Sequence, residues 1–178
     1  MHEDILKFWF EELTPKHWWG KDEGLDALIA DRYAGLLDSA SQCELFGWRT
    51  SPRGRLAEVI VLDQFSRHIH RGRPLAFARD PLALALAQEA VARADDDALT
   101  PVQRVFLYLP YMHSESPRIQ QVSVALYAKN GLSDNLDFAM RHQAIVERFG
   151  RYPHRNEILG RDSTPEEIAF LSEPGSAF

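Results

Sequence analysis

Among the places where a residue type that caps helices is followed directly by proline, five start a predicted helix: Ser51-Pro52, Asp80-Pro81, Thr100-Pro101, Ser116-Pro117 and Thr164-Pro165. The cap side chain accepts a hydrogen bond from a backbone amide that the first helical turn leaves unpaired. Proline loses no bond at the first helical position, because its missing N–H would have had no partner there. Five such starts within 178 residues predict a protein built from many helices.

The spacing of apolar residues agrees with this prediction, because it follows a helical period and two-residue alternation is scarce. The apolar run 59–62 could form a buried strand, but it lies within a longer helical pattern that starts at Ser51-Pro52. Pro110 falls inside a predicted helix and should kink it. The predicted helices cover residues 3–12, 22–40, 52–68, 81–94, 101–113, 117–130, 134–149 and 165–172. We therefore expect an all-α array of about eight antiparallel helices with short loops, forming one domain over residues 1–178.

Composition limits the classes of function. Cys43 is the only cysteine, so the chain has no intramolecular disulfide and no cysteine-based zinc site. With 20 Lys+Arg and 26 Asp+Glu, the net charge of −6 disfavours general binding to nucleic acids or anionic membranes. The acidic start, Met1 to Asp4, does not resemble a signal peptide, and no apolar run approaches the roughly 20 residues of a membrane span. We expect a cytoplasmic protein, with no cofactor motif and no metal-ligand spacing.

Several polar residues continue helical stripes that are otherwise apolar. Asp63 and Arg67 lie on the same helix face as Leu56, and they are four residues apart, so they can pair directly. Gln64 is next to Asp63. His113 ends the apolar stripe of the helix predicted at 101–113. These positions place polar groups where a core is expected.

The same pattern recurs later in the chain. Glu115 closely follows the helix predicted at 101–113, and His142 interrupts the apolar face of the helix predicted at 134–149. Because unpaired burial of such groups is costly, we expect them to meet at one locus. The loop after residue 150 could close that locus. The candidate binding residues are Asp63, Gln64, Arg67, His113, Glu115, His142, Arg151, His154, Arg155 and Asn156.

Three functions are compatible with this cluster. In the first, Arg67, Arg151 and Arg155, with Arg161 as a further donor, bind a small anion or a carboxylate-bearing peptide. In the second, the cluster belongs to a hydrolase whose catalytic candidates are His113, Glu115 and His142, working by acid–base or metal-assisted chemistry. In the third, the protein is a helical scaffold and the cluster is a buried structural network. A nucleic-acid surface around residues 148–161 is the least compatible with the acidic balance.

Three long motifs also resemble a known family. They are the run from Val61 to Arg67, the run from Phe106 to Glu115, and the run from Arg148 to Asn156 with Leu159-Gly160-Arg161. These runs, with Phe8-Trp9-Phe10 and Trp19 to Asp22, are similar to an uncharacterised bacterial domain of unknown function placed with tetratricopeptide-like helical proteins.

The resemblance covers nearly the whole chain, with Ser66 in place of an expected proline. It implies an all-α, tetratricopeptide-like fold and no established reaction, cofactor or catalytic residue.

Overall fold

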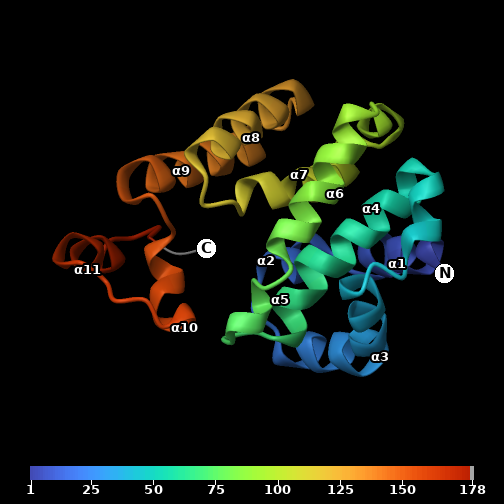
Figure 1. Ribbon diagram of the computed structural model, residues 1–178, viewed down its shortest axis with the longest axis horizontal. Helices are drawn as coiled ribbons and strands as arrows, with labels where there is room; N and C mark the ends of the chain where they lie inside the picture. The colour runs from blue at the N-terminus through green and yellow to red at the C-terminus, as the bar shows by residue number, and fades with distance from the viewer. Residues whose placement is uncertain (177–178) are drawn as a thin grey trace.

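The computed structural model describes residues 1–176, and these residues form helices joined by short connections, without a β-strand (Figure 1). With α4 and α5 counted as one continuous helix, the described chain has ten helices instead of about eight. The helices are α1 (His2–Lys7), α2 (Pro15–Trp19), α3 (Glu23–Ser41), α4 (Pro52–Ile60), α5 (Ser66–Ile69), α6 (Asp80–Ala92), α7 (Pro101–Met112), α8 (Pro117–Asn130), α9 (Ser133–Phe149), α10 (Asn156–Leu159) and α11 (Pro165–Leu171).

Each of the eight expected helices is present, and the two additional ones are short. Helices α2 and α10 have five and four residues, too short to show an apolar period. Short 3₁₀ turns lie at Phe46–Thr50, Pro74–Ala76, Asp95–Ala98 and Pro153–Arg155. The all-α prediction is therefore confirmed. The count differs because α2 and α10 are too short to show an apolar period, although Thr14-Pro15 at the start of α2 is a further cap–proline pair.

Four of the five predicted cap–proline pairs start helices where expected. Ser51, Thr100 and Thr164 each accept a hydrogen bond from the amide three residues further on. Ser116 precedes α8 without such a bond. Asp80 is the exception, because it is the first residue of α6 and its carboxylate instead pairs with an arginine of α5.

The long helix that starts at Pro52 is not regular along its length. Between α4 and α5, the segment Val61–Phe65 forms a π-helical turn, η3, whose backbone hydrogen bonds join residues five apart instead of four. A second π-helical turn, Phe8–Glu12, continues α1. Such turns often lie at functional sites, because they re-aim side chains that a regular helix would turn elsewhere. Asp63 lies within η3.

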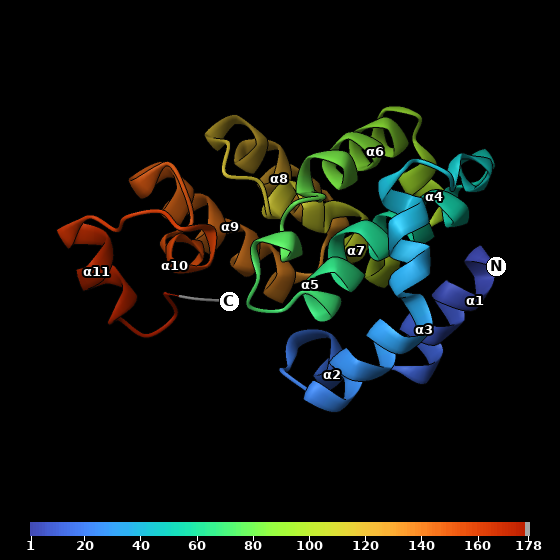
Figure 2. The ribbon, with the colours of Figure 1, turned by 60° about the horizontal axis from the view of Figure 1, so that its bottom comes forward.

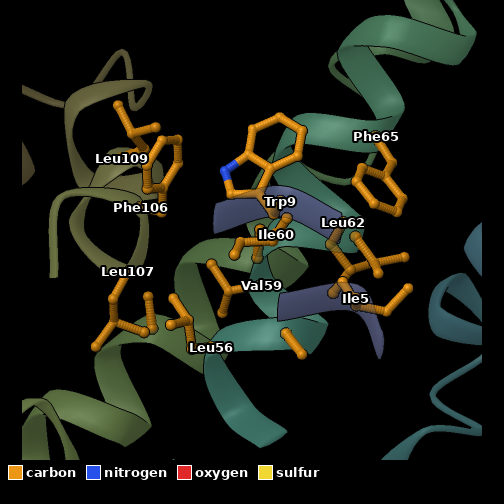
Figure 3. Close-up of a cluster of buried hydrophobic side chains, with 14 of the residues drawn as sticks. Ile5, Trp9, Leu56, Val59, Ile60, Leu62, Phe65, Phe106, Leu107 and Leu109 are labelled. Atoms are coloured by element: carbon orange, nitrogen blue, oxygen red, sulfur yellow. The ribbon is translucent and has the colours of Figure 1, made fainter. Parts of the chain in front are cut away.

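The main hydrophobic core is built around aromatic rings from the π-helical turn after α1, from α3, from η3 and from α7 (Figure 3). Trp9 lies between Phe106 of α7 and Phe65 of η3, with ring centroids 5.5 and 5.7 Å away. Phe65 also packs on Tyr33 of α3 at 4.9 Å. Burial of these rings joins α1, α3, α4 and α7 into one body.

The C-terminal part of the chain lies to one side of this body (Figures 1 and 2). Helices α8 and α9 pack against each other and lead from α7 to α10 and α11. A small second apolar cluster, which includes Ile145, Val146 and Tyr152, supports this region. No helix in residues 1–176 is long and apolar enough to cross a membrane. The helix lengths vary from four to nineteen residues, so the tetratricopeptide-like arrangement stays a prediction.

Candidate functional site

A pocket of about 350 Å³ opens where the main body meets the C-terminal part. Three segments line it: the stretch from Pro74 into α6, the end of α7 with the three residues that follow it, and the turn 153–155 (η6) with α10. This volume lies at the lower end of the range for small-molecule sites. The lining residues are Pro74, Phe77, Ala78, Asp80, Pro81, Leu84, Pro110, His113, Ser114, Glu115, Arg155 and Leu159.

His113 and Asp63 form a close pair at the back of this pocket. The imidazole Nδ1 of His113 lies 2.7 Å from Oδ1 of Asp63, which is fully buried in η3. We place the ring proton on Nδ1, because an ionised carboxylate accepts and does not donate. Asp63 also accepts a hydrogen bond from Nε2 of Gln64 at 2.6 Å. The sequence prediction that Asp63, Gln64 and His113 meet agrees with this geometry.

Charges around this pair determine its protonation. Burial raises the pKa of Asp63, but the guanidinium of Arg67 and the nearby His113 outweigh it and hold that pKa below its usual value. Burial and the charge of Arg67 lower the pKa of His113, against the opposing effect of Asp63. The histidine is therefore neutral at neutral pH, with an ionised carboxylate on Nδ1 and a lone pair on Nε2. A neutral imidazole held in this way can accept a proton or a hydrogen bond.

Arg67 links Asp63 to a second carboxylate. Its Nη1 lies 3.3 Å from Oδ1 of Asp63 and donates to the Asp63 carbonyl oxygen at 2.8 Å. The same guanidinium donates two parallel hydrogen bonds to the Asp80 carboxylate, at 2.9 and 3.0 Å. Arg67 thus uses its donors on two protein carboxylates and does not line the pocket. The expected Asp63–Arg67 pair is present. The expected direct contact of Arg67 with a ligand does not fit the structure, because Arg67 is not among the residues that line the pocket.

Arg155 is the arginine that lines the pocket. Its guanidinium lies between the rings of Phe77 and Tyr152, with centroids 4.6 and 4.7 Å away. The side chain is 8% exposed, and its closest carboxylate contact is Asp80, 3.5 Å from Nη1. Its Nε is buried and has no hydrogen-bond partner among residues 1–176. Because Nε is closed to solvent, only the terminal nitrogens of Arg155 could meet a ligand in the pocket.

Glu115 and Asn156 form a neighbouring network around Arg161. Two parallel hydrogen bonds, at 2.7 and 2.9 Å, join the Arg161 guanidinium to the Glu115 carboxylate. Glu115 also accepts a hydrogen bond from the backbone N–H of Tyr152, and Arg161 donates through Nε to the side chain of Asn156. Burial raises the pKa of Glu115, but the Arg161 hydrogen bonds outweigh it and lower that pKa. Glu115 lines the pocket with its charge already matched.

Arg151 points away from the predicted cluster. Its Nε and Nη2 donate to the Glu167 carboxylate of α11, at 2.6 and 2.8 Å, and Nη2 also reaches the carbonyl oxygen of Asp162. The prediction that Arg151 joins Arg67 and Arg155 in one anion pocket is therefore wrong. The reason is that Glu167 lies in the first turn of α11, where its carboxylate accepts a hydrogen bond from the backbone N–H of Thr164. Its position is thereby fixed, and Arg151 is the cation that pairs with it.

His142 and His154 both lie beside Tyr152, and neither lines the pocket. Their rings are 5.6 and 5.5 Å from the Tyr152 ring, and Nδ1 of His142 lies 2.8 Å from the carbonyl oxygen of Phe138. Burial lowers the pKa of His142 to about 3 and that of His154 to about 4. His142 is therefore placed beside Tyr152 and makes its Nδ1 contact with the α9 backbone.

Two residues of the site were not among those expected. Asp80 was interpreted as a helix cap because proline follows it, although the same carboxylate serves equally well as an arginine partner. Phe77 gave no signal, since a single aromatic residue in a loop resembles ordinary packing. No group of three or more His, Cys, Asp or Glu in the described part of the chain could hold a metal ion.

Comparison with known proteins places the chain in a family without assigning a reaction. Residues 5–175 match the model of a family described as bacterial protein of unknown function (DUF924). A solved structure of a protein of unknown function from Agrobacterium tumefaciens is similar, with 41% sequence identity, a TM-score of 0.91 and 96% of each chain covered. Comparison with curated proteins gives no match. The match over nearly its full length shows that the chain belongs to this bacterial family of unknown function.

Proposed function

We propose that the protein binds a small anionic ligand, above all a carboxylate, in the pocket between α6, the end of α7 and the η6–α10 segment. The observation that carries this proposal is Arg155. A buried guanidinium normally has its donors satisfied, because an unpaired buried charge is costly. Arg155 instead lies against two rings at the wall of an open pocket, with Nε unpartnered and closed to solvent and Nη1 3.5 Å from Asp80. A carboxylate or phosphate in the pocket suits the two terminal nitrogens of this guanidinium.

The surrounding charges favour this function over a purely structural network. A structural cluster would pair each charge and leave no space, whereas a pocket of about 350 Å³ adjoins Arg155. Arg67 and Asp80 position the site in this proposal, since Arg67 holds the carboxylate that faces Arg155. We further propose a cytoplasmic protein with a degenerate tetratricopeptide-like array, which fits its single cysteine and its succession of antiparallel helices.

The proposal is tested by calorimetric titration with 4-methylpentanoate and, separately, with inorganic phosphate. Replacement of Arg155 by Gln removes the charge and keeps a polar stem of moderate length. We expect the wild-type chain to bind one equivalent of at least one probe, and R155Q to weaken that binding at least tenfold, as for the loss of a charged hydrogen bond.

The matched control is Arg148→Gln, because Arg148 is an exposed arginine paired with Glu166 outside the pocket. It should bind like the wild type. Absence of saturable binding to both probes, or equal affinity in R155Q and the wild type, would overturn the proposal.

A second candidate is acid–base catalysis of hydrolysis in the same pocket, and the Asp63–His113 pair favours it. Nε2 of His113 would take a proton from water, whose oxygen adds to an acyl carbon as the alkoxide or phenolate leaves. The probe is mono-4-nitrophenyl succinate, an ester that carries a carboxylate. Release of 4-nitrophenolate that His113→Asn abolishes would support this candidate. Equal rates in the two proteins would exclude it for this ester class.

A further inference from the structure

Some charged groups that line the pocket are already hydrogen-bonded to other side chains of the protein, and others are not. Asp80 receives two hydrogen bonds from Arg67, and Glu115 receives two from Arg161. These carboxylates therefore offer little to a ligand. The capacity left for a ligand lies in the terminal nitrogens of Arg155, whose carboxylate contact is 3.5 Å long, and in Nε2 of His113, the ring nitrogen that does not face Asp63.

These two groups offer complementary chemistry. Arg155 is a cation with donors only, whereas the neutral His113 ring presents an acceptor at Nε2. A ligand that uses both must carry an anionic acceptor group and a separate hydrogen-bond donor.

The two groups belong to one pocket, because both Arg155 and His113 line it. They are also joined through the protein, since Nη1 of Arg155 is 3.5 Å from Asp80, and Arg67 joins Asp80 to Asp63, which in turn contacts His113. The smallest ligand that offers both an anionic group and a separate donor carries the donor on the carbon next to the carboxylate.

Apart from Ser114, the rest of the pocket wall is mainly apolar. It is formed by the side chains of Pro74, Phe77, Pro81, Leu84, Pro110 and Leu159. Apolar walls gain free energy by covering an aliphatic chain and offer nothing to a further polar substituent. The space suits a branched aliphatic group of a few carbon atoms.

From this arrangement we infer that the ligand is a small carboxylic acid with an aliphatic side chain and a hydroxyl or ammonium donor on the carbon next to the carboxylate. Arg155 holds the carboxylate, and Nε2 of His113 accepts the hydrogen bond from the donor. Asp63 is a positioning residue, because it fixes the ring and its proton through Nδ1. This inference rests on the proposed function, whose carboxylate contact it extends to a substrate class.

A series of three probes with one carbon skeleton tests the inference. They are 4-methylpentanoate, 2-hydroxy-4-methylpentanoate and leucine, which differ only in carrying hydrogen, hydroxyl or ammonium on C2. We expect calorimetry on the wild-type chain to show about tenfold tighter binding for the hydroxy acid or leucine than for 4-methylpentanoate, the gain of one well-placed hydrogen bond. Which of the two binds more tightly distinguishes a hydroxyl from an ammonium ligand.

His113→Asn provides the matched variant. The asparagine amide can still donate to Asp63 from near the position of Nδ1, but nothing replaces the acceptor at Nε2. The preference for a C2 donor should disappear in this variant, while the affinity for 4-methylpentanoate stays within about twofold of the wild type. A circular dichroism melt checks whether the variant is folded. If the variant does not fold, the comparison of the three probes on the wild-type chain decides by itself.

The possible failures are distinguishable. If all three probes bind the wild type equally and R155Q weakens them all, the inference is wrong and the proposed function stands. If the preference persists in H113N, the donor is recognised elsewhere and the inference is also wrong. If none of the three acids binds, or R155Q binds all three like the wild type, the inference fails. The proposed function fails with it unless the wild type binds inorganic phosphate and R155Q weakens that binding.

Discussion

The main helical body and the C-terminal segment after Gly150 are held in place by different forces. In the body, rings and aliphatic chains of α1, α3, α4 and α7 are buried against one another, with Trp9 and Phe65 at the centre. The C-terminal segment shares a small apolar cluster with the end of α9 and is attached by ion pairs, chiefly Glu115 with Arg161 and Asp80 with Arg155. Within the segment, Arg151 pairs with Glu167. The pocket lies where the two meet.

This difference matters because the two kinds of contact respond differently to change. Apolar burial is non-directional and spreads over many atoms, so the body should unfold as a unit. Hydrogen-bonded ion pairs are directional and depend on single atoms, so removal of one partner should loosen a local region. A segment of the second kind at the edge of a pocket can adjust to a ligand without loss of the core.

The largest effect is expected from Phe65→Ala. The Phe65 ring is fully buried and packs on Phe8, Trp9 and Tyr33, so its removal leaves a cavity in the centre of the body. We expect the free energy of unfolding to fall by about 3–5 kcal/mol, measured by urea titration with fluorescence and circular dichroism. Phe46→Ala, at an exposed ring, should change it by less than about 0.5 kcal/mol. If F65A lowered the free energy of unfolding by no more than F46A does, Phe65 would not belong to the core.

A smaller and local effect is expected from Glu115→Gln. The substitution removes the charge that receives two hydrogen bonds from Arg161 and one from the Tyr152 backbone. We expect a cost of about 1.5–3 kcal/mol, with faster amide hydrogen exchange confined to residues 150–171. Glu166→Gln, at the exposed pair with Arg148, should cost about 0–1 kcal/mol. Faster exchange throughout the body of E115Q would show that the two regions are not separable.

The smallest effect concerns pH and His142, on the α9 face next to Tyr152. Burial lowers its pKa to about 3, whereas the unfolded value is about 6.5. Below pH 6.5 the unfolded chain therefore binds a proton that the folded chain excludes, so stability is lost as the pH falls from about 6.5 towards 3. Between pH 7.5 and 5.5, the wild type should lose about 1 kcal/mol more stability than His142→Gln. Parallel pH curves for the two proteins, measured by urea unfolding, would show that His142 is protonated in the folded chain.

The helices were predictable from local chemistry. Ser51, Thr100 and Thr164 cap helices in the expected way, because a cap needs only residues a few positions apart. The meeting of Asp63, Gln64 and His113 was predictable because helical period places polar groups on an apolar face and burial requires partners.

The arginine partners could not be predicted in the same way. Arg151, Arg155 and Arg161 are close in sequence and chemically alike, yet only Arg155 lines the pocket. Arg151 instead reaches Glu167, and Arg161 reaches Glu115. The choice depends on where a loop directs each long side chain, and loop direction depends on packing of the whole chain.

The sequence by itself therefore determined the all-helical class, the positions of the long helices and the polar residues that had to be buried, because propensity, capping and periodicity are local properties. Only the tertiary structure decided that Asp80 pairs with Arg67 instead of capping a helix, and that Phe77 and Tyr152 enclose Arg155. Those contacts join segments far apart in the chain, and a charged side chain takes the nearest complementary charge that the fold brings within reach.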